Sequence, residues 1–146
     1  MSRICSKILL SLLISCTVIV SAVAENMKTL GSMDVHYIAI GATFLTPEIT
    51  KAYDIERSRY NGLINISVLN NTQPNKPAMA VDITGTAQNN IGQIKQLQFK
   101  QVTEGNAIYY LAQLHYSDQE DFHFNITIKN GKTTQHLKFS QKFYVE

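Results

Sequence analysis

Hydrophobic and polar side chains alternate with a period of two along most of the chain after residue 25, and turn-forming residues interrupt the alternation every eight to twelve positions. This spacing is typical of an antiparallel sandwich or barrel. Seven strands fit the pattern: residues 34–40, 63–70, 78–87 and 94–102, one after a turn at 103–106, residues 121–129, and a last strand through Phe143 to Val145. We therefore expect an all-β fold, an immunoglobulin-like antiparallel β-sandwich of about seven strands with one short helix inserted between strands 1 and 2.

The same alternation assigns the inward faces of these strands. A turn at residues 103–106 and a hairpin turn at Asn130-Gly131 set the registers. The opposed pairs are then Phe99 with Tyr110, Leu97 with Ala112, Phe124 with Leu137, and Phe122 with Phe139. We predict one core that contains Phe99, Tyr110, Phe122, Phe124, Leu137 and Phe139.

Residues 46–53 break the alternation and predict the short helix. Thr46 is a favourable N-cap, Pro47 suits the first helical position, and Glu48 places an acid in the first turn. A helix of two turns is marginal alone, so it must pack against the sandwich to persist.

The N-terminal segment has the pattern of a secretory signal. Arg3 and Lys7 precede an apolar run from residue 8 to 20, and Ala22-Val23-Ala24 supplies the small residues that signal peptidase requires. The run is shorter than the roughly 20 residues that span a bilayer as a helix. We expect residues 1–24 to be a cleaved signal peptide, residues 25–146 to form a single β-sandwich domain, and no transmembrane anchor to remain.

An alternative cleavage site lies within the same segment. Leu13-Ile14-Ser15-Cys16 fits the pattern at which bacterial lipoproteins are cut and lipidated. The residues that follow Cys16 are mostly apolar, whereas a lipidated cysteine is usually followed by a polar tether. The periplasmic or secreted form that begins at Glu25 is therefore the preferred interpretation.

Cleavage after Ala24 would leave a domain of bland composition. Both cysteines, Cys5 and Cys16, leave with the signal, so no disulfide or thiolate metal site remains. Loss of Arg3 and Lys7 reduces the 13 basic residues to 11, which equals the number of acidic residues. A net charge near zero argues against a nucleic-acid partner or a polybasic membrane site.

Residues 25–146 contain no recognised catalytic, phosphate-binding or calcium-binding motif, and no cofactor is expected. Histidine is the remaining group of chemical interest. If the fifth and sixth strands were neighbours, His115, His123 and His136 would form a row that could hold Zn²⁺ or Cu²⁺. The simpler interpretation is three exposed histidines, and in an immunoglobulin-like sandwich those two strands belong to opposite sheets.

The segment from Thr46 to Gly62 is the candidate functional surface, because it interrupts the succession of strands. In an extended stretch Arg57 and Arg59 project from the same side, and with Tyr60 they could bind a carboxylate or sugar-phosphate group. The structural alternative is that one arginine pairs with Asp54 or Glu56 and holds the helix in place.

Five stretches of the sequence are distinctive: Thr43-Phe-Leu-Thr-Pro-Glu-Ile-Thr-Lys-Ala-Tyr53, residues 57–69, Gly85-Thr-Ala, Gly105-Asn-Ala-Ile-Tyr-Tyr110 and Gln141-Lys-Phe-Tyr144. Together they resemble the family catalogued as domain of unknown function 4426, whose members are small secreted proteins of Gram-negative bacteria. The resemblance implies a periplasmic or envelope location and a single β-sandwich domain. It brings no catalytic residue.

These observations favour a non-enzymatic envelope or periplasmic binding or accessory protein, with a protein, peptide or glycan as its partner. The alternatives are a periplasmic metal-binding protein that uses the surface histidines, and an enzyme whose site the sequence does not reveal.

The first prediction concerns processing. The exported protein should begin at Glu25, because signal peptidase cuts after the small-x-small pattern that ends at Ala24. Intact mass spectrometry of the exported protein measures this directly. A diacylated species that begins at Cys16 would contradict the prediction.

Overall fold

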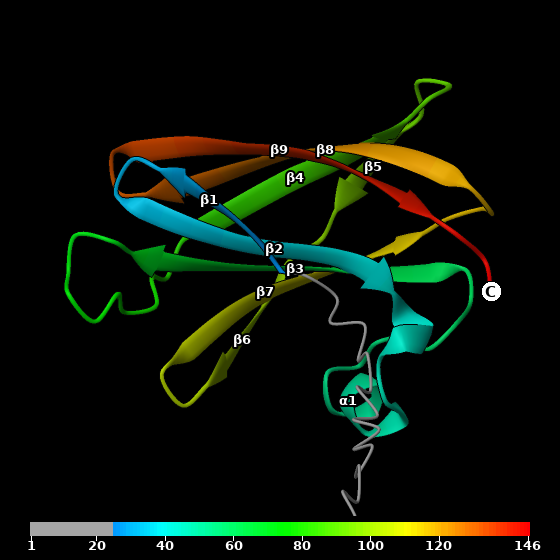
Figure 1. Ribbon diagram of the computed structural model, residues 1–146, viewed down its shortest axis with the longest axis horizontal. Helices are drawn as coiled ribbons and strands as arrows, with labels where there is room; N and C mark the ends of the chain where they lie inside the picture. Colours follow the sequence, from blue (N-terminus) through cyan, green and yellow to red (C-terminus); the bar gives the residue numbers. More distant parts are fainter. Residues whose placement is uncertain (1–24) are drawn as a thin grey trace, which may run out of the picture.

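The computed structural model describes residues 25–146, which form two antiparallel sheets packed face to face (Figure 1). The predicted signal, its cleavage site and the alternative lipidation site lie outside the described residues. The strands are β1 (Asn26–Leu30), β2 (Met33–Gly41), β3 (Asn61–Asn70), β4 (Asp82–Asn89), β5 (Ile94–Leu97), β6 (Lys100–Glu104), β7 (Ala107–His115), β8 (Glu120–Asn130) and β9 (Thr133–Phe143). A 3₁₀ turn, η1 (Ala42–Phe44), and a helix, α1 (Pro47–Ala52), lie between β2 and β3.

The strand order is that of an immunoglobulin-like sandwich. One sheet has the order β1-β2-β3-β7-β6 and the other β5-β4-β8-β9. With β2 as strand A, these are the A-B-E-D and C′-C-F-G sheets of that fold, and β1 is an added edge strand beside strand A. The expected fold class is confirmed, with nine strands in the described part of the chain instead of about seven.

The core lies between the sheets and contains the predicted aromatic residues. Tyr110, Phe122, Phe124 and Leu137 are buried, whereas Phe99 and Phe139 are partly buried and pack against them. The rings of Phe124 and Phe139 stack with their centroids 4.6 Å apart and an interplanar angle of 11°. The inward faces read from the alternation are therefore correct.

The predicted strand at 94–102 is wrong as a single element. Residues 94–97 pair with β4 in one sheet and residues 100–104 pair with β7 in the other. Leu97 consequently lies opposite Gly85 and not opposite Ala112. The chain crosses between sheets at residues 98–99, because each short piece completes the edge of a different sheet.

Both predicted hairpin registers are wrong by two residues. Tyr110 lies opposite Gln101, and Leu137 lies opposite Ile126. The first turn is tighter than the expected four-residue loop, since Glu104 pairs directly with Ala107. A shift of two residues leaves every side chain on its face, which is why the predicted core survives.

The predicted helix is confirmed as α1. The side chain of Thr46 accepts a hydrogen bond from the backbone N–H of Ile49 at 3.3 Å, and Pro47 is the first helical residue. Figure 1 shows that α1 lies beyond the β2-β3-β7 layer, on the side away from the other sheet. Neither helical segment of residues 25–146 is long and apolar enough to cross a membrane.

Truncation of one buried ring tests the assigned core. Phe124→Ala should lower the free energy of unfolding by about 3 to 5 kcal/mol, because the ring is only 2% exposed and its removal leaves Phe139 without its stacked partner. Phe44→Ala is the matched control, with a ring that is 61% exposed, and should cost less than about 1 kcal/mol. Urea denaturation measures both. Equal losses in the two variants would show that the inward face is misassigned.

Candidate functional site

Two leucines are buried on the outer face of a sheet, where solvated side chains are the rule. Leu63 on β3 and Leu111 on β7 alternate with core residues and face away from the other sheet, yet they are 5% and 9% exposed. Together with Ala42 and Ile55 they form a second hydrophobic cluster, separate from the main core. The sheet is therefore covered at this place.

The cover is the segment of residues 42–60, here called the insert. A pair of amide side chains fastens its second half to the sheet. The fully buried Asn61 donates from Nδ2 to the Glu56 carbonyl and to Gln113 Oε1, both at 2.8 Å. Gln113 Oε1 also accepts from the Glu56 N–H at 2.9 Å, and its Nε2 donates to the Asp54 carbonyl at 3.3 Å. These bonds give backbone groups of the insert the partners that a sheet would otherwise supply.

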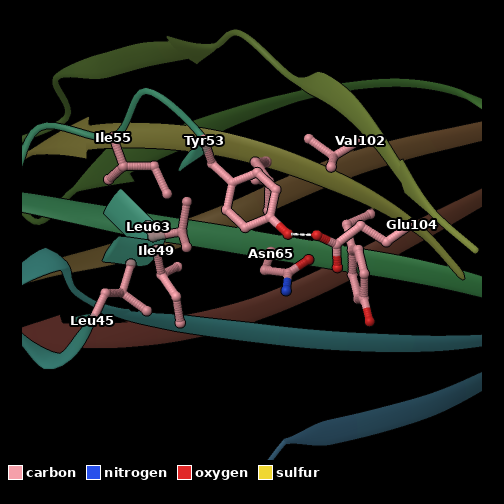
Figure 2. A pocket seen from close by; sticks show the side chains of 10 residues that line it. Leu45, Ile49, Tyr53, Ile55, Leu63, Asn65, Val102 and Glu104 are labelled. Carbon is pink, nitrogen blue, oxygen red and sulfur yellow. Dashed lines mark hydrogen bonds between the residues drawn. The ribbon is translucent and has the colours of Figure 1, made fainter. Parts of the chain in front are cut away.

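The cover is incomplete and leaves a pocket of about 270 Å³ between the insert and the β6–β7 hairpin (Figure 2). Its walls come from the insert, β3, β6 and β7. The lining residues are Leu45, Ile49, Tyr53, Ile55, Leu63, Asn65, Val102, Glu104, Tyr109 and Leu111. Most of this surface is apolar, as in sites that bind small molecules or single side chains.

Tyr53 and Glu104 point toward one another across the pocket (Figure 2). The Tyr53 hydroxyl donates a hydrogen bond to Glu104 Oε1, which ties the end of α1 to β6. This bond raises the pKa of Tyr53, because it favours the protonated hydroxyl beside a carboxylate. The hydroxyl therefore stays protonated at neutral pH.

Asn65 supplies the second polar side chain of the pocket. Its Oδ1 atom is buried and has no hydrogen-bond partner among residues 25–146. A buried amide oxygen without a partner is unfavourable, and such groups often mark a place where a ligand or water completes the hydrogen bonding.

None of the three predicted binding residues, Arg57, Arg59 and Tyr60, lines this pocket. Arg57 donates from Nε to the Leu45 carbonyl at 3.0 Å and from Nη2 to the Thr43 carbonyl at 3.3 Å. Arg57 thus connects two parts of the insert. Among the described residues it forms no ion pair with Asp54 or Glu56, the acids that the structural alternative named. Arg59 lies 6.0 Å from the ring centroid of its neighbour, the exposed Tyr60.

The structure separates the three histidines. β7 and β8 belong to opposite sheets, so His115 does not lie beside His123. His115 Nε2 is 3.0 Å from Glu56 Oε2, and His123 Nδ1 is 2.7 Å from the Ser140 hydroxyl.

His136 lies opposite Thr127, while His123 lies opposite Ser140, because of the two-residue register shift. His136 therefore does not lie beside His123, as the predicted row of histidines requires. In the part of the chain that the structure describes, no three histidine, cysteine, aspartate or glutamate side chains are placed to hold a metal ion.

A second polar cluster at the other end of the sheet is structural. Asp34 is buried and accepts hydrogen bonds from Lys76 at 2.9 Å, Asn71 at 3.1 Å and Thr29 at 2.9 Å. The bond from Lys76, followed by those from Asn71 and Thr29, lowers the pKa of Asp34 to about 2. These bonds fasten the loop at 71–76 to β2.

The sequence did not predict the pocket. Asn65 and Glu104 were not candidates, and Tyr53 lies within the candidate segment from Thr46 to Gly62 but was not singled out. The available signal was the apolar character of Leu63 and Leu111, since both fall on the outward side of strands whose inward faces were already assigned. Two apolar residues on an otherwise outward face indicate that something covers them.

Fold and site together define an immunoglobulin-like sandwich domain with a side-chain-sized pocket on the outer face of one sheet. The chain belongs to the family described as "Domain of unknown function (DUF4426)", whose profile matches residues 27–146. The resemblance expected from the sequence is thereby confirmed.

Solved structures with the same fold include a DUF4426 family protein from Pseudomonas aeruginosa, with 29% identity and a TM-score of 0.72 over 84% of this chain and 96% of that one. A copper-bound variant of FetP from uropathogenic Escherichia coli has 10% identity and a TM-score of 0.57, over 82% and 95% of the two chains.

FetP as isolated after expression in the Escherichia coli periplasm has 12% identity and a TM-score of 0.56, over 83% and 94%. At these identities the FetP structures show a shared fold alone. Among curated proteins the comparison finds no match to this chain.

Replacement of Arg57 tests its role in the insert. Arg57→Ala should destabilise the protein by about 1 kcal/mol and speed amide hydrogen exchange in residues 46–53, because two hydrogen bonds from its guanidinium are lost. Arg59→Ala is the matched control and should leave exchange there unchanged. Faster exchange in the Arg59 variant alone would reverse the two assignments.

Proposed function

We propose that the protein is an exported, non-enzymatic binding protein of the cell envelope, and that it holds a side chain of a partner polypeptide in the pocket beside β6. The observation that carries this proposal is the pocket itself: an apolar hollow on an outer sheet face, roofed by a segment that the sandwich does not require. Loops and insertions positioned by a rigid sandwich commonly carry binding sites.

The position of β6 supports a polypeptide partner. β6 is the last strand of its sheet, so its second edge has no neighbouring strand among the described residues. Val102 and Glu104 of this strand line the pocket. An extended segment added along β6 could therefore place one side chain in the pocket while its backbone pairs with the strand.

Exposed apolar side chains on the insert support the same partner. Phe44, Ile49 and Tyr60 are 61%, 42% and 54% exposed, and all three lie within 17 residues of one another along the insert. Several exposed apolar side chains on one segment favour a protein-binding role for that segment. The pocket's ionisable groups are Tyr53, Glu104 and Tyr109, and a binding role needs only their hydrogen bonds and rings.

Export is supported by the signal pattern of residues 1–24 and by the fold shared with FetP, a protein that was expressed in the periplasm. A periplasmic domain meets envelope proteins and their extended segments. The proposed partner is therefore an envelope polypeptide.

Site-specific crosslinking tests the proposal. A photoreactive phenylalanine analogue at position 49, on the pocket wall, should crosslink to a discrete envelope polypeptide in intact cells, because the partner would contact this wall. The matched control is the same analogue at position 94, where Ile94 is 60% exposed on the other sheet. Electrophoresis of crosslinked products compares the two. The proposal fails if position 49 gives no product or the same products as position 94.

A further inference from the structure

Two hydrogen-bond acceptors of the pocket, one on Glu104 and one on Asn65, lack a partner among residues 25–146. Tyr53 uses its proton for Glu104 Oε1. Glu104 Oε2 makes no hydrogen bond within residues 25–146, and Asn65 Oδ1 is buried without one. A ligand that satisfies both atoms must bring donors.

The charge of the lining has a single sign. Among residues 25–146, Glu104 is the only charged residue that lines the pocket. Lys100 lies on the same face of β6 as Glu104, but its side chain lines an adjacent hollow together with Gln113. Of the basic groups on the insert, Arg57 is bound to the carbonyls of residues 43 and 45, and neither Lys51 nor Arg59 lines the pocket. The field within the pocket therefore favours a cation.

The shape of the lining also favours a ligand with a long apolar stem. Leu45, Ile49 and Val102 provide aliphatic walls, while Tyr53 and Tyr109 provide aromatic rings. A side chain with an aliphatic stem and a charged end buries its stem along apolar surface and keeps its charged end at a polar group. Guanidinium groups also stack on aromatic rings, which ammonium groups do less well.

We propose that the pocket receives an arginine side chain of the partner polypeptide, with the guanidinium fork donating to Glu104 Oε2 and Asn65 Oδ1 and the stem lying among the apolar walls. This inference rests on the proposed function and names the chemistry that the pocket recognises. The planar fork supplies several donors in fixed directions, which matches two separate acceptors better than the single ammonium of lysine.

The carboxylate is prepared for this role before the ligand arrives. The Tyr53 hydroxyl occupies one oxygen of Glu104 and holds the group at the pocket wall. Glu104 is exposed, so a cation can pair with it without the large desolvation cost of a fully buried charge. Part of the entropic cost of ordering the Glu104 carboxylate beside a cation is therefore already met in the free protein.

Three short peptides that differ only in the central residue test the inference. Each has two glycines on either side of that residue and blocked ends, and the central residue is arginine, citrulline or leucine. Citrulline has nearly the shape of arginine but no charge. NMR titration of the processed protein should show shifts around the pocket, and the arginine peptide should bind at least about tenfold more tightly than the citrulline peptide, since hydrogen bonds to charged groups are the stronger ones.

Glu104→Gln should abolish the preference for arginine over citrulline and leave binding of the leucine peptide unchanged, because glutamine retains an acceptor for Tyr53. Glu48→Gln is the matched control: it removes one negative charge from the insert outside the pocket and should keep the preference. Equal melting temperatures of the two variants ensure that the comparison reports on binding.

The outcomes separate the inference from the proposed function. Binding of the leucine peptide at the pocket, with arginine no better than citrulline, overturns the inference and supports the apolar site. A preference that survives in Glu104→Gln also overturns it. If no peptide shifts the pocket resonances, the arginine inference is rejected, and the proposed function is then decided by crosslinking from position 49.

Discussion

Leu63 and Leu111 face away from the core between the sheets, and their burial is the contact on which the insert and the pocket both depend. Burying one leucine side chain stabilises a protein by about 1.5 to 3 kcal/mol. The two-turn α1 has too few hydrogen bonds to persist alone. Docking of Ile55 and Ala42 on the two leucines therefore supplies the stabilisation that the local sequence lacks, and the outer face gains a cover that the sandwich itself does not need.

Side-chain hydrogen bonds determine which part of the insert is attached to the sheet. Asn61 and Gln113 fasten residues 54–56 to β3 and β7, whereas the helical half of the insert reaches the sheet through apolar side chains and the bond from Tyr53 to Glu104. At residues 54–56, backbone groups of the insert find their hydrogen-bond partners in the side chains of Asn61 and Gln113. The pocket lies at the helical half, between α1 and the β6–β7 hairpin.

The sequence predicted the sandwich well because period-two alternation reports directly on which side chains face the core. Registers were less accessible: the turn residues fix them, and at residue 131 the chain turns one position later than the Asn-Gly pair suggested, with Asn130 paired to Thr133. The sheet change at residues 98–99 left no mark in the alternation, since both pieces keep the same inward parity. The pocket was inaccessible for another reason, because it joins residues 45, 65 and 104, which only tertiary packing brings together.

This chain and FetP share a fold at 10% to 12% identity, and a shared fold does not determine a shared chemistry. Specific chemistry has to reside where side chains converge outside the buried core. The histidines do not converge, because His115 and His123 lie on different sheets. His115 contacts Glu56, and His123 contacts Ser140. At the pocket, in contrast, one carboxylate, one unpartnered amide oxygen and two phenol rings meet an apolar wall. A carboxylate beside an unpartnered amide oxygen favours a ligand that brings hydrogen-bond donors, and the apolar wall favours an apolar stem, so donors attached to an apolar stem complement this site.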